Sequence, residues 1–172
     1  MSTDEVIKKM DFPTGERRKQ IQKLCLDSMK VVPIGEEDVQ TGLDFYKHFF
    51  TNFPDLRVYF KGAEKYTAED VQKSERFKKQ GRRITLAVHL VVQSYNNPMV
   101  LHAYIREYVN RHIQFKMEHI LHREFWDVWM GYLESRANGK PLDQETKDAW
   151  TELAEEYFYV CRQYLKSIGK PY

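Results

Sequence analysis

The stretch FKKQGRRI, residues 77–84, places a glutamine beside a glycine in a helical pattern. Gln80 of this stretch is followed 32 residues later by His112, which ends the segment YVNRH (residues 108–112). Phe60 precedes the glutamine by 20 residues, and Pro54 precedes that phenylalanine by six. This order of a proline, an aromatic ring, a polar side chain beside glycine and a distant histidine is unusual.

Length and composition predict one globular domain. The 172 residues are enough for a sizeable core, and 42% hydrophobic with 14% aromatic residues is typical of a folded chain. The 27 basic and 25 acidic residues nearly balance, which gives no case for nucleic acid or an anionic membrane as the main partner. We find no apolar stretch of membrane-spanning length, and no signal-peptide core in residues 1–13. We therefore predict a flexible N-terminal arm over residues 1–13 and a single domain over residues 14–172.

The two cysteines favour a reducing compartment. Cys25 and Cys161 lie far apart in the sequence and match no metal-binding or redox spacing. We interpret them as reduced thiols, which indicates a cytoplasmic protein. A disulfide between the first and last helices is the alternative.

Apolar residues recur at helical spacing along the whole chain, and we find no strand alternation, internal repeat or low-complexity tract. Pro54 is expected to open a short turn, Thr67 to cap a helix that runs to about Tyr95, and Asp143 to cap the last helix. The other helices are predicted to begin near Gly15 and to cover about residues 36–52, 98–112 and 120–136. Together these segments predict an all-α fold of six or seven helices.

The segment from about residue 42 to 133 resembles globins, and the flanking helices extend the resemblance over nearly the whole chain. The likeness is closest to the nematode myoglobin-like intracellular globins, through FFTNFPDLRVYF (residues 49–60). It implies a globin fold of six to eight helices, in a three-on-three sandwich around haem b. It also implies that His112 is the proximal ligand of the iron, through one neutral ring nitrogen while the other is hydrogen-bonded nearby. Without the resemblance, His112 is one of six histidines and more typical of a core or surface residue.

The resemblance implies two hydrogen-bond donors on the ligand-binding side of the haem. Gln80 matches the distal position of the E helix, where its amide can donate to dioxygen but is a poor ligand for iron. Tyr46 lies eight residues before Pro54 and matches a ligand-facing position of the B helix. Taken alone, Gln80 is more typical of an exposed helical residue, and Tyr46 of a core tyrosine bonded to the backbone.

The same resemblance implies which residues hold the cofactor. Phe60 would stack against the porphyrin, and Ile84 would lie over it. The predicted pocket walls are Tyr108, Met117 and Trp126. Arg83, Arg111 and Lys116 are candidates to pair with the haem propionates, but each is equally typical of a solvated surface charge.

The resemblance also bears on how the helices pack, at two glycines and two polar residues. Gly42 and Gly81 match the small positions where the B and E helices of globins cross, and a side chain there would force the helices apart. His122 and Arg123 depart from the family, which usually packs apolar groups at the start of the G helix. Either the helix is rotated at this point or these side chains reach the surface.

The function implied by the resemblance is oxygen binding for storage, transport or buffering, and not catalysis. The expected partners are dioxygen and other diatomic gases. One alternative is an enzyme that oxidises nitric oxide, which would need a separate reductase because the chain has no room for a flavin or nicotinamide domain. A haem-based gas sensor is the other alternative, and a homodimer is also open.

Overall fold

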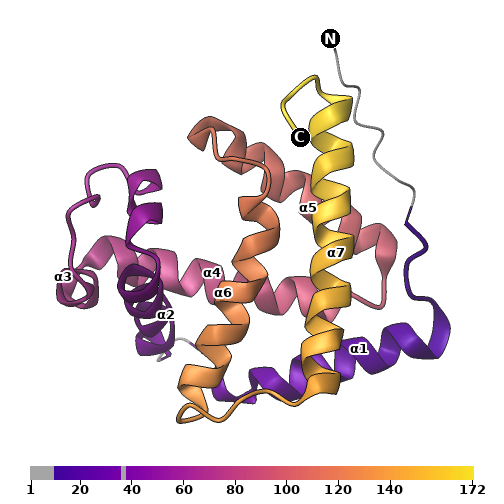
Figure 1. Cartoon of the computed structure of the whole chain (residues 1–172), viewed down its shortest axis with the longest axis horizontal. Helices are drawn as coiled ribbons and strands as arrows, with labels where there is room; N and C mark the ends of the chain where they lie inside the picture. The colour runs from indigo at the N-terminus through magenta and orange to yellow at the C-terminus, as the bar shows by residue number, and fades with distance from the viewer. Residues whose placement is uncertain (1–9, 36–37) are drawn as a thin grey trace.

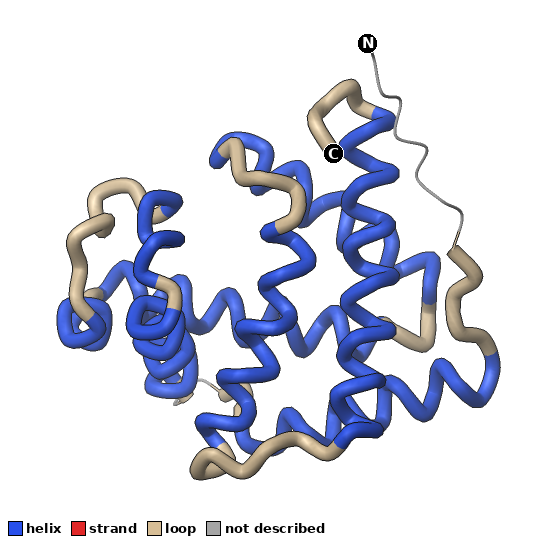
Figure 2. The backbone as a smooth tube through the Cα atoms, in the orientation of Figure 1, coloured by secondary structure: helices blue, strands red, loops and turns tan. Residues whose placement is uncertain are grey.

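The computed structural model describes residues 10–35 and 38–172, and in that part of the chain it contains helices and loops but no strand (Figure 2). The α-helices are α1 (Gly15–Ser28), α2 (Val39–Asn52), α3 (Ala68–Lys73), α4 (Glu75–Ser94), α5 (Pro98–His112), α6 (Leu121–Arg136) and α7 (Gln144–Ser167). Three short 3-10 helices join them: η1 (Met29–Val31), η2 (Pro54–Tyr59) and η3 (Ile113–Phe115). The all-α prediction is confirmed. Most of the predicted arm and the expected helix start at Glu36 lie outside the described residues.

The helices form two layers of three, as the resemblance predicted. In one layer α4 contacts both α1 and α5, and in the other α6 contacts both α2 and α7. Across the layers α2 packs on α4, while α1 and α5 pack on α7. Figure 1 shows α6 and α7 side by side, crossing α4 and α1 behind them. Over the described residues, no helix is both long and apolar enough to cross a lipid bilayer.

The prediction of one continuous helix from Thr67 to Tyr95 was wrong, because the chain breaks at Ser74. Thr67 caps α3 through a capping box with Asp70, as expected. Ser74 then takes an extended conformation, with φ −88° and ψ 120°, and its hydroxyl accepts a hydrogen bond from the backbone N–H of Phe77. A serine side chain that binds the backbone in this way starts a new helix instead of continuing the old one.

The crossing of α2 and α4 depends on Gly42 and Gly81. A Cβ atom built on Gly42 would lie 2.3 Å from the carbonyl carbon of Gly81, and one on Gly81 would lie 2.5 Å from the carbonyl carbon of Gly42. The two backbones are therefore in direct contact. Close to this crossing, Tyr46 on α2 packs against Phe77 on α4, with 5.0 Å between ring centroids.

A buried ion pair joins the first helix to the last. The Arg18 guanidinium donates to both carboxylate oxygens of Glu156, at 2.9 and 2.7 Å, and only 4% and 0% of these two side chains are exposed. His102 on α5 donates through Nε2 to the same carboxylate at 2.7 Å. The Arg18 Nε also donates to the carbonyl of Tyr95. The carboxylate therefore ties three helices together.

Replacing Glu156 with glutamine is expected to lower the free energy of unfolding by about 2 kcal/mol, because the amide cannot neutralise buried Arg18. Burial raises the pKa of Glu156, but the hydrogen bonds from His102 and Arg18 outweigh it and hold the pKa below its ordinary value. The ionised carboxylate therefore stabilises the fold above the ordinary glutamate pKa, and that stability is lost as the pH falls through the lowered value. Urea titrations at neutral and acidic pH should show a smaller acid destabilisation in Glu156→Gln. Equal pH dependence in both proteins would contradict this role.

Both cysteines are free and buried. Cys25 lies on α1 and Cys161 on α7, and burial raises the pKa of each thiol above its ordinary value. The alternative of a disulfide between the terminal helices is therefore wrong for this structure.

Candidate functional site

A cavity of about 570 Å³ lies between the two helical layers. Its lining side chains come from α2, η2, α4, α5, η3, α6 and α7, and most of them are aromatic or aliphatic. This volume and this apolar lining are typical of a binding site for a small organic ligand or cofactor.

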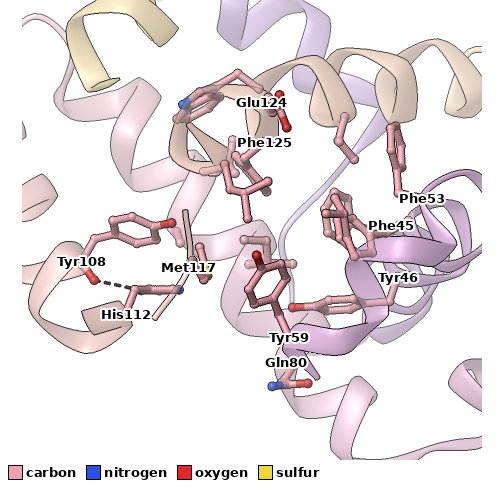
Figure 3. A pocket seen from close by; sticks show the side chains of 18 of the residues that line it. Phe45, Tyr46, Phe53, Tyr59, Gln80, Tyr108, His112, Met117, Glu124 and Phe125 are labelled. Carbon is pink, nitrogen blue, oxygen red and sulfur yellow. Dashed lines mark hydrogen bonds between the residues drawn. The ribbon is translucent and has the colours of Figure 1, made fainter. Parts of the chain in front are cut away.

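His112 lies at the C-terminal end of α5 and brings one ring nitrogen to the cavity. Its Nδ1 donates to the carbonyl oxygen of Tyr108 at 2.8 Å, since a carbonyl can only accept. In the neutral ring the lone pair is then on Nε2, which points into the cavity (Figure 3). Burial lowers the pKa of His112, with the backbone bond to Tyr108 opposing it, so the ring is neutral near pH 7. A neutral imidazole held in this way is ready to bind a metal atom.

Tyr46 reaches the cavity from α2, on the side away from His112 (Figure 3). Its ring packs against Phe77 and Phe60, with centroid distances of 5.0 and 5.8 Å. These contacts aim the hydroxyl into the cavity. Burial raises the pKa of Tyr46 above its ordinary value, so the hydroxyl keeps its proton and can donate it to a ligand.

Gln80 lies on α4, on the same side of the cavity as Tyr46 (Figure 3). Its Oε1 atom is buried and has no hydrogen-bond partner within the described part of the chain. A buried amide that lacks a partner costs free energy, so it is expected to face a ligand or a water molecule. An amide oxygen only accepts, so Gln80 can donate from this place, beside the Tyr46 hydroxyl and opposite His112, once a half-turn of the amide brings its N–H₂ there.

The chemistry of the cavity fits a large, mostly apolar prosthetic group that carries a metal atom. Phe60 is anchored by Phe50 and Phe49, at centroid distances of 5.3 and 5.6 Å, and presents its ring to the cavity. Ile84 lies one helical turn after Gln80 and also lines the cavity. Flat apolar walls, one free imidazole nitrogen and two opposed donors are what such a group needs.

Eight of the residues singled out from the sequence are brought together around this cavity. They are Tyr46, Phe60, Gln80, Ile84, Tyr108, His112, Met117 and Trp126. Arg83, Arg111 and Lys116 are exposed and do not line it, so their pairing with propionates stays a prediction.

Sequence reasoning missed several wall residues. Arg76, Tyr59 and Phe125 all line the cavity. Arg76 lies four residues before Gln80 and therefore on the same face of α4. From this spacing, Arg76 could have been predicted to line the cavity. Phe125 precedes Trp126 on α6 and lies against Phe45 at a centroid distance of 6.0 Å. No sequence signal separates such a wall residue from an ordinary core aromatic.

His122 and Arg123 take different places. Arg123 is partly buried, with 18% of its side chain exposed, and donates to Glu155 at 2.6 Å and to Asp127 at 3.1 Å. His122 does not reach the surface. It is buried, and its Nδ1 lies 3.1 Å from the hydroxyl oxygen of Tyr108. Of the two alternatives, the surface position is therefore wrong for His122, because Tyr108 offers it a polar partner inside the protein; a rotation of the helix stays a prediction.

Comparisons with known proteins agree on one family. The family model described as Globin matches residues 43–161. A globin-like protein of Caenorhabditis briggsae is 49% identical over 157 residues, which cover 90% of this chain and 96% of that protein. A myoglobin of Nippostrongylus brasiliensis is 41% identical over 153 residues, which cover 88% and 97% respectively. A high-resolution structure of a globin-like protein of Caenorhabditis elegans matches with TM-score 0.86 and 47% identity, over 90% of this chain and 98% of that one.

Proposed function

Because this chain belongs to the globin family, we propose that it is an oxygen-binding haem protein in which His112 holds the iron. The observation that carries the proposal is the free Nε2 atom of His112, which faces the Tyr46 hydroxyl from the opposite side of an apolar cavity (Figure 3). Myoglobins among the related proteins support the same reading. The role is reversible ligand binding for storage, transport or buffering, and not catalysis.

The side chains around the cavity have distinct tasks in this proposal. Haem b, when bound, supplies an iron atom that takes up dioxygen reversibly. Phe60 and Ile84, which line the cavity, would pack against the flat group and exclude water from it. Tyr108, Met117 and Trp126 form further walls. Arg83 and Arg111, which are exposed, would pair with the propionates of the bound haem.

Tyr46 and Gln80 set the affinity for dioxygen. Each donates a hydrogen bond to the ligand in a site from which water is excluded. A hydrogen bond to a group with partial negative charge contributes roughly 1.5–3 kcal/mol, and a neutral one less. Since about 1.4 kcal/mol is a tenfold change in affinity, each donor tightens binding by about an order of magnitude. High affinity and slow release of dioxygen follow.

The cytoplasm is the proposed location. Cys25 and Cys161 are both free thiols, which is typical of a protein kept in a reducing compartment.

The direct test is reconstitution of the purified protein with haemin. We expect a ferrous, oxygen-free absorption spectrum with five-coordinate iron, and a reversible spectral change when oxygen is admitted. A protein that stays colourless after reconstitution would end the proposal. An irreversible change to the ferric form on first contact with oxygen would leave haem binding intact but refute oxygen storage or transport.

Replacing Tyr46 with phenylalanine is expected to speed the release of dioxygen about ten-fold, because it removes one donor and keeps the ring. Stopped-flow displacement of dioxygen measures this rate. Tyr66→Phe is the matched control, since Tyr66 also contacts Phe77, at 6.1 Å between centroids, but does not line the cavity. An unchanged rate in Tyr46→Phe would remove this hydroxyl from the ligand site.

A further inference from the structure

The imidazole of His112 is enclosed by two aromatic rings. The ring of Tyr108 lies against it, with 4.0 Å between centroids and 33° between planes. Phe115 approaches it edge-on, at 5.7 Å and 65°. The hydrogen bond from Nδ1 to the Tyr108 carbonyl fixes one atom of the imidazole but does not by itself fix the plane of the ring. Contact with the Tyr108 ring supplies that second restraint.

Tyr108 is in turn held by a residue on another helix. Its hydroxyl lies 3.1 Å from Nδ1 of His122, and the two rings are nearly perpendicular, at 80° and 5.6 Å between centroids. Tyr157 on α7 supports the Tyr108 ring edge-on at 5.5 Å. Only 5% of His122 is exposed, so water cannot easily replace it as the partner of the phenol.

We propose that Tyr108 and His122 form a positioning pair that sets the plane of the His112 ring, and with it the direction in which Nε2 points into the cavity. The proposal rests on His112 as the iron ligand, as argued above. His122 does not line the cavity, and Tyr108 lines it beside His112, away from Tyr46, so neither is placed to donate to the gas ligand (Figure 3). Their effect on it passes through the orientation of the imidazole.

The hydrogen bond between the Tyr108 and His122 side chains is needed because α5 and α6 have few other contacts. The backbone of α5 packs chiefly on α7 and α4, whereas His122 belongs to the first turn of α6. The bond between Tyr108 and His122 therefore connects the imidazole to a helix that α5 hardly touches otherwise. If this bond is lost, the Tyr108 ring keeps its contact with Tyr157 on α7 but loses its tie to α6, and the flat support of the imidazole is held less firmly.

The direction of the hydrogen bond depends on the charge and the tautomer of His122. Burial lowers the pKa of His122 to about 4, with His112 and His119 lowering it further, so its ring is uncharged near neutral pH. In the tautomer that carries its hydrogen on Nε2, the phenol donates and Nδ1 accepts. An amide oxygen placed where Nδ1 lies would serve as the acceptor equally well, which suggests a conservative rescue.

The experiment compares Tyr108→Phe, His122→Leu and His122→Asn in the haem-loaded ferrous protein. Resonance Raman spectroscopy records the iron–histidine stretching band, which a purely structural role would not move, and transfer to an apoglobin acceptor gives the rate of haem loss. We expect a shifted or broadened band and about five-fold faster haem loss in Tyr108→Phe and His122→Leu. His122→Asn should keep the wild-type band. Tyr164→Phe is the control, because it removes another phenol bond to α5, at 2.9 Å from Asn110, away from His112.

The possible results distinguish a positioning role of Tyr108 and His122 from a merely structural one. An unchanged band in Tyr108→Phe would overturn the proposal, and so would equal shifts in Tyr108→Phe and Tyr164→Phe. A wild-type protein that binds no haem would refute the proposed function, but not the pair. In that case, or if His122→Leu fails to fold, nitrogen-15 spectra of the histidine rings in the haem-free Tyr108→Phe protein decide. We expect the resonances of His112 and His122 to move, and their constancy would refute the pair.

Discussion

Replacing His112 with glycine is expected to abolish stable haem binding. Its Nε2 is the ring nitrogen that faces the cavity opposite Tyr46, so its loss leaves the iron without a protein ligand. Loss of a residue that merely supports a metal ligand costs about 10–100-fold in metal affinity, and loss of the ligand itself should exceed that. Haem loss should therefore be faster by more than about 100-fold. Gel filtration after reconstitution, followed by the transfer rate to an apoglobin acceptor, measures the effect.

Two further experiments distinguish loss of the histidine that binds iron from loss of the folded structure. Glycine at position 112 leaves room for an imidazole, so free imidazole added to His112→Gly should restore haem retention and the ferrous spectrum. His119→Ala removes another histidine outside the cavity wall and should retain haem normally. Tight retention in His112→Gly without imidazole, with an unchanged ferrous spectrum, would show that another group holds the iron.

Replacing Gly42 with alanine is expected to lower the free energy of unfolding by about 3 kcal/mol or more. The new methyl group would lie 2.3 Å from the carbonyl carbon of Gly81 and 2.4 Å from its Cα. These are backbone atoms inside α4, which cannot rotate away as a side chain can. The helices would have to separate by about 1 Å to reach ordinary contact, and the packing along α2 and α4 would loosen.

Urea unfolding followed by circular dichroism measures this loss, and Gly131→Ala is the matched control. Gly131 also lies within a helix, but a Cβ there would meet only His48 Nε2 at 3.5 Å, an ordinary contact. Alanine at that position should be neutral, or stabilising by up to about 1 kcal/mol. Equal stability in Gly42→Ala and wild type would show that the crossing tolerates a side chain. Because Tyr46 and Gln80 flank the crossing, Gly42→Ala should also release dioxygen faster.

Local signals predicted most of the helix boundaries. Pro54 starts η2, Asp143 caps α7 through the Thr146 backbone N–H at 2.8 Å, and α5 begins at Pro98. These residues act on their own backbone, so they have the same effect wherever the helix lies in the fold. Ser74 was missed because its neighbours Lys73 and Glu75 are compatible with a helix, and only the side-chain cap to Phe77 separates α3 from α4.

The residues around the cavity also fall into some that were predicted and some that were not. The resemblance to globins pointed to Tyr46, Gln80 and His112, and all three line the cavity. It also singled out Arg83 and Arg111, which lie outside the wall, and it passed over Arg76, which lines it. Long charged side chains extend in several directions from one helix position, so position alone does not say which of them reaches the cavity.

The sequence by itself determined most of the helices and their order, because periodicity and caps act over a few residues, whereas His112 was singled out only by the resemblance to globins. Only the tertiary structure decided what surrounds that histidine. Tyr108 and His122 are separated by the connection between α5 and α6, and they meet because two helices bring them within 3.1 Å. Arg18 and Glu156 meet in the same way, from opposite ends of the chain. The partner of a buried polar group is set by which helices pack together, and that choice depends on the whole core at once.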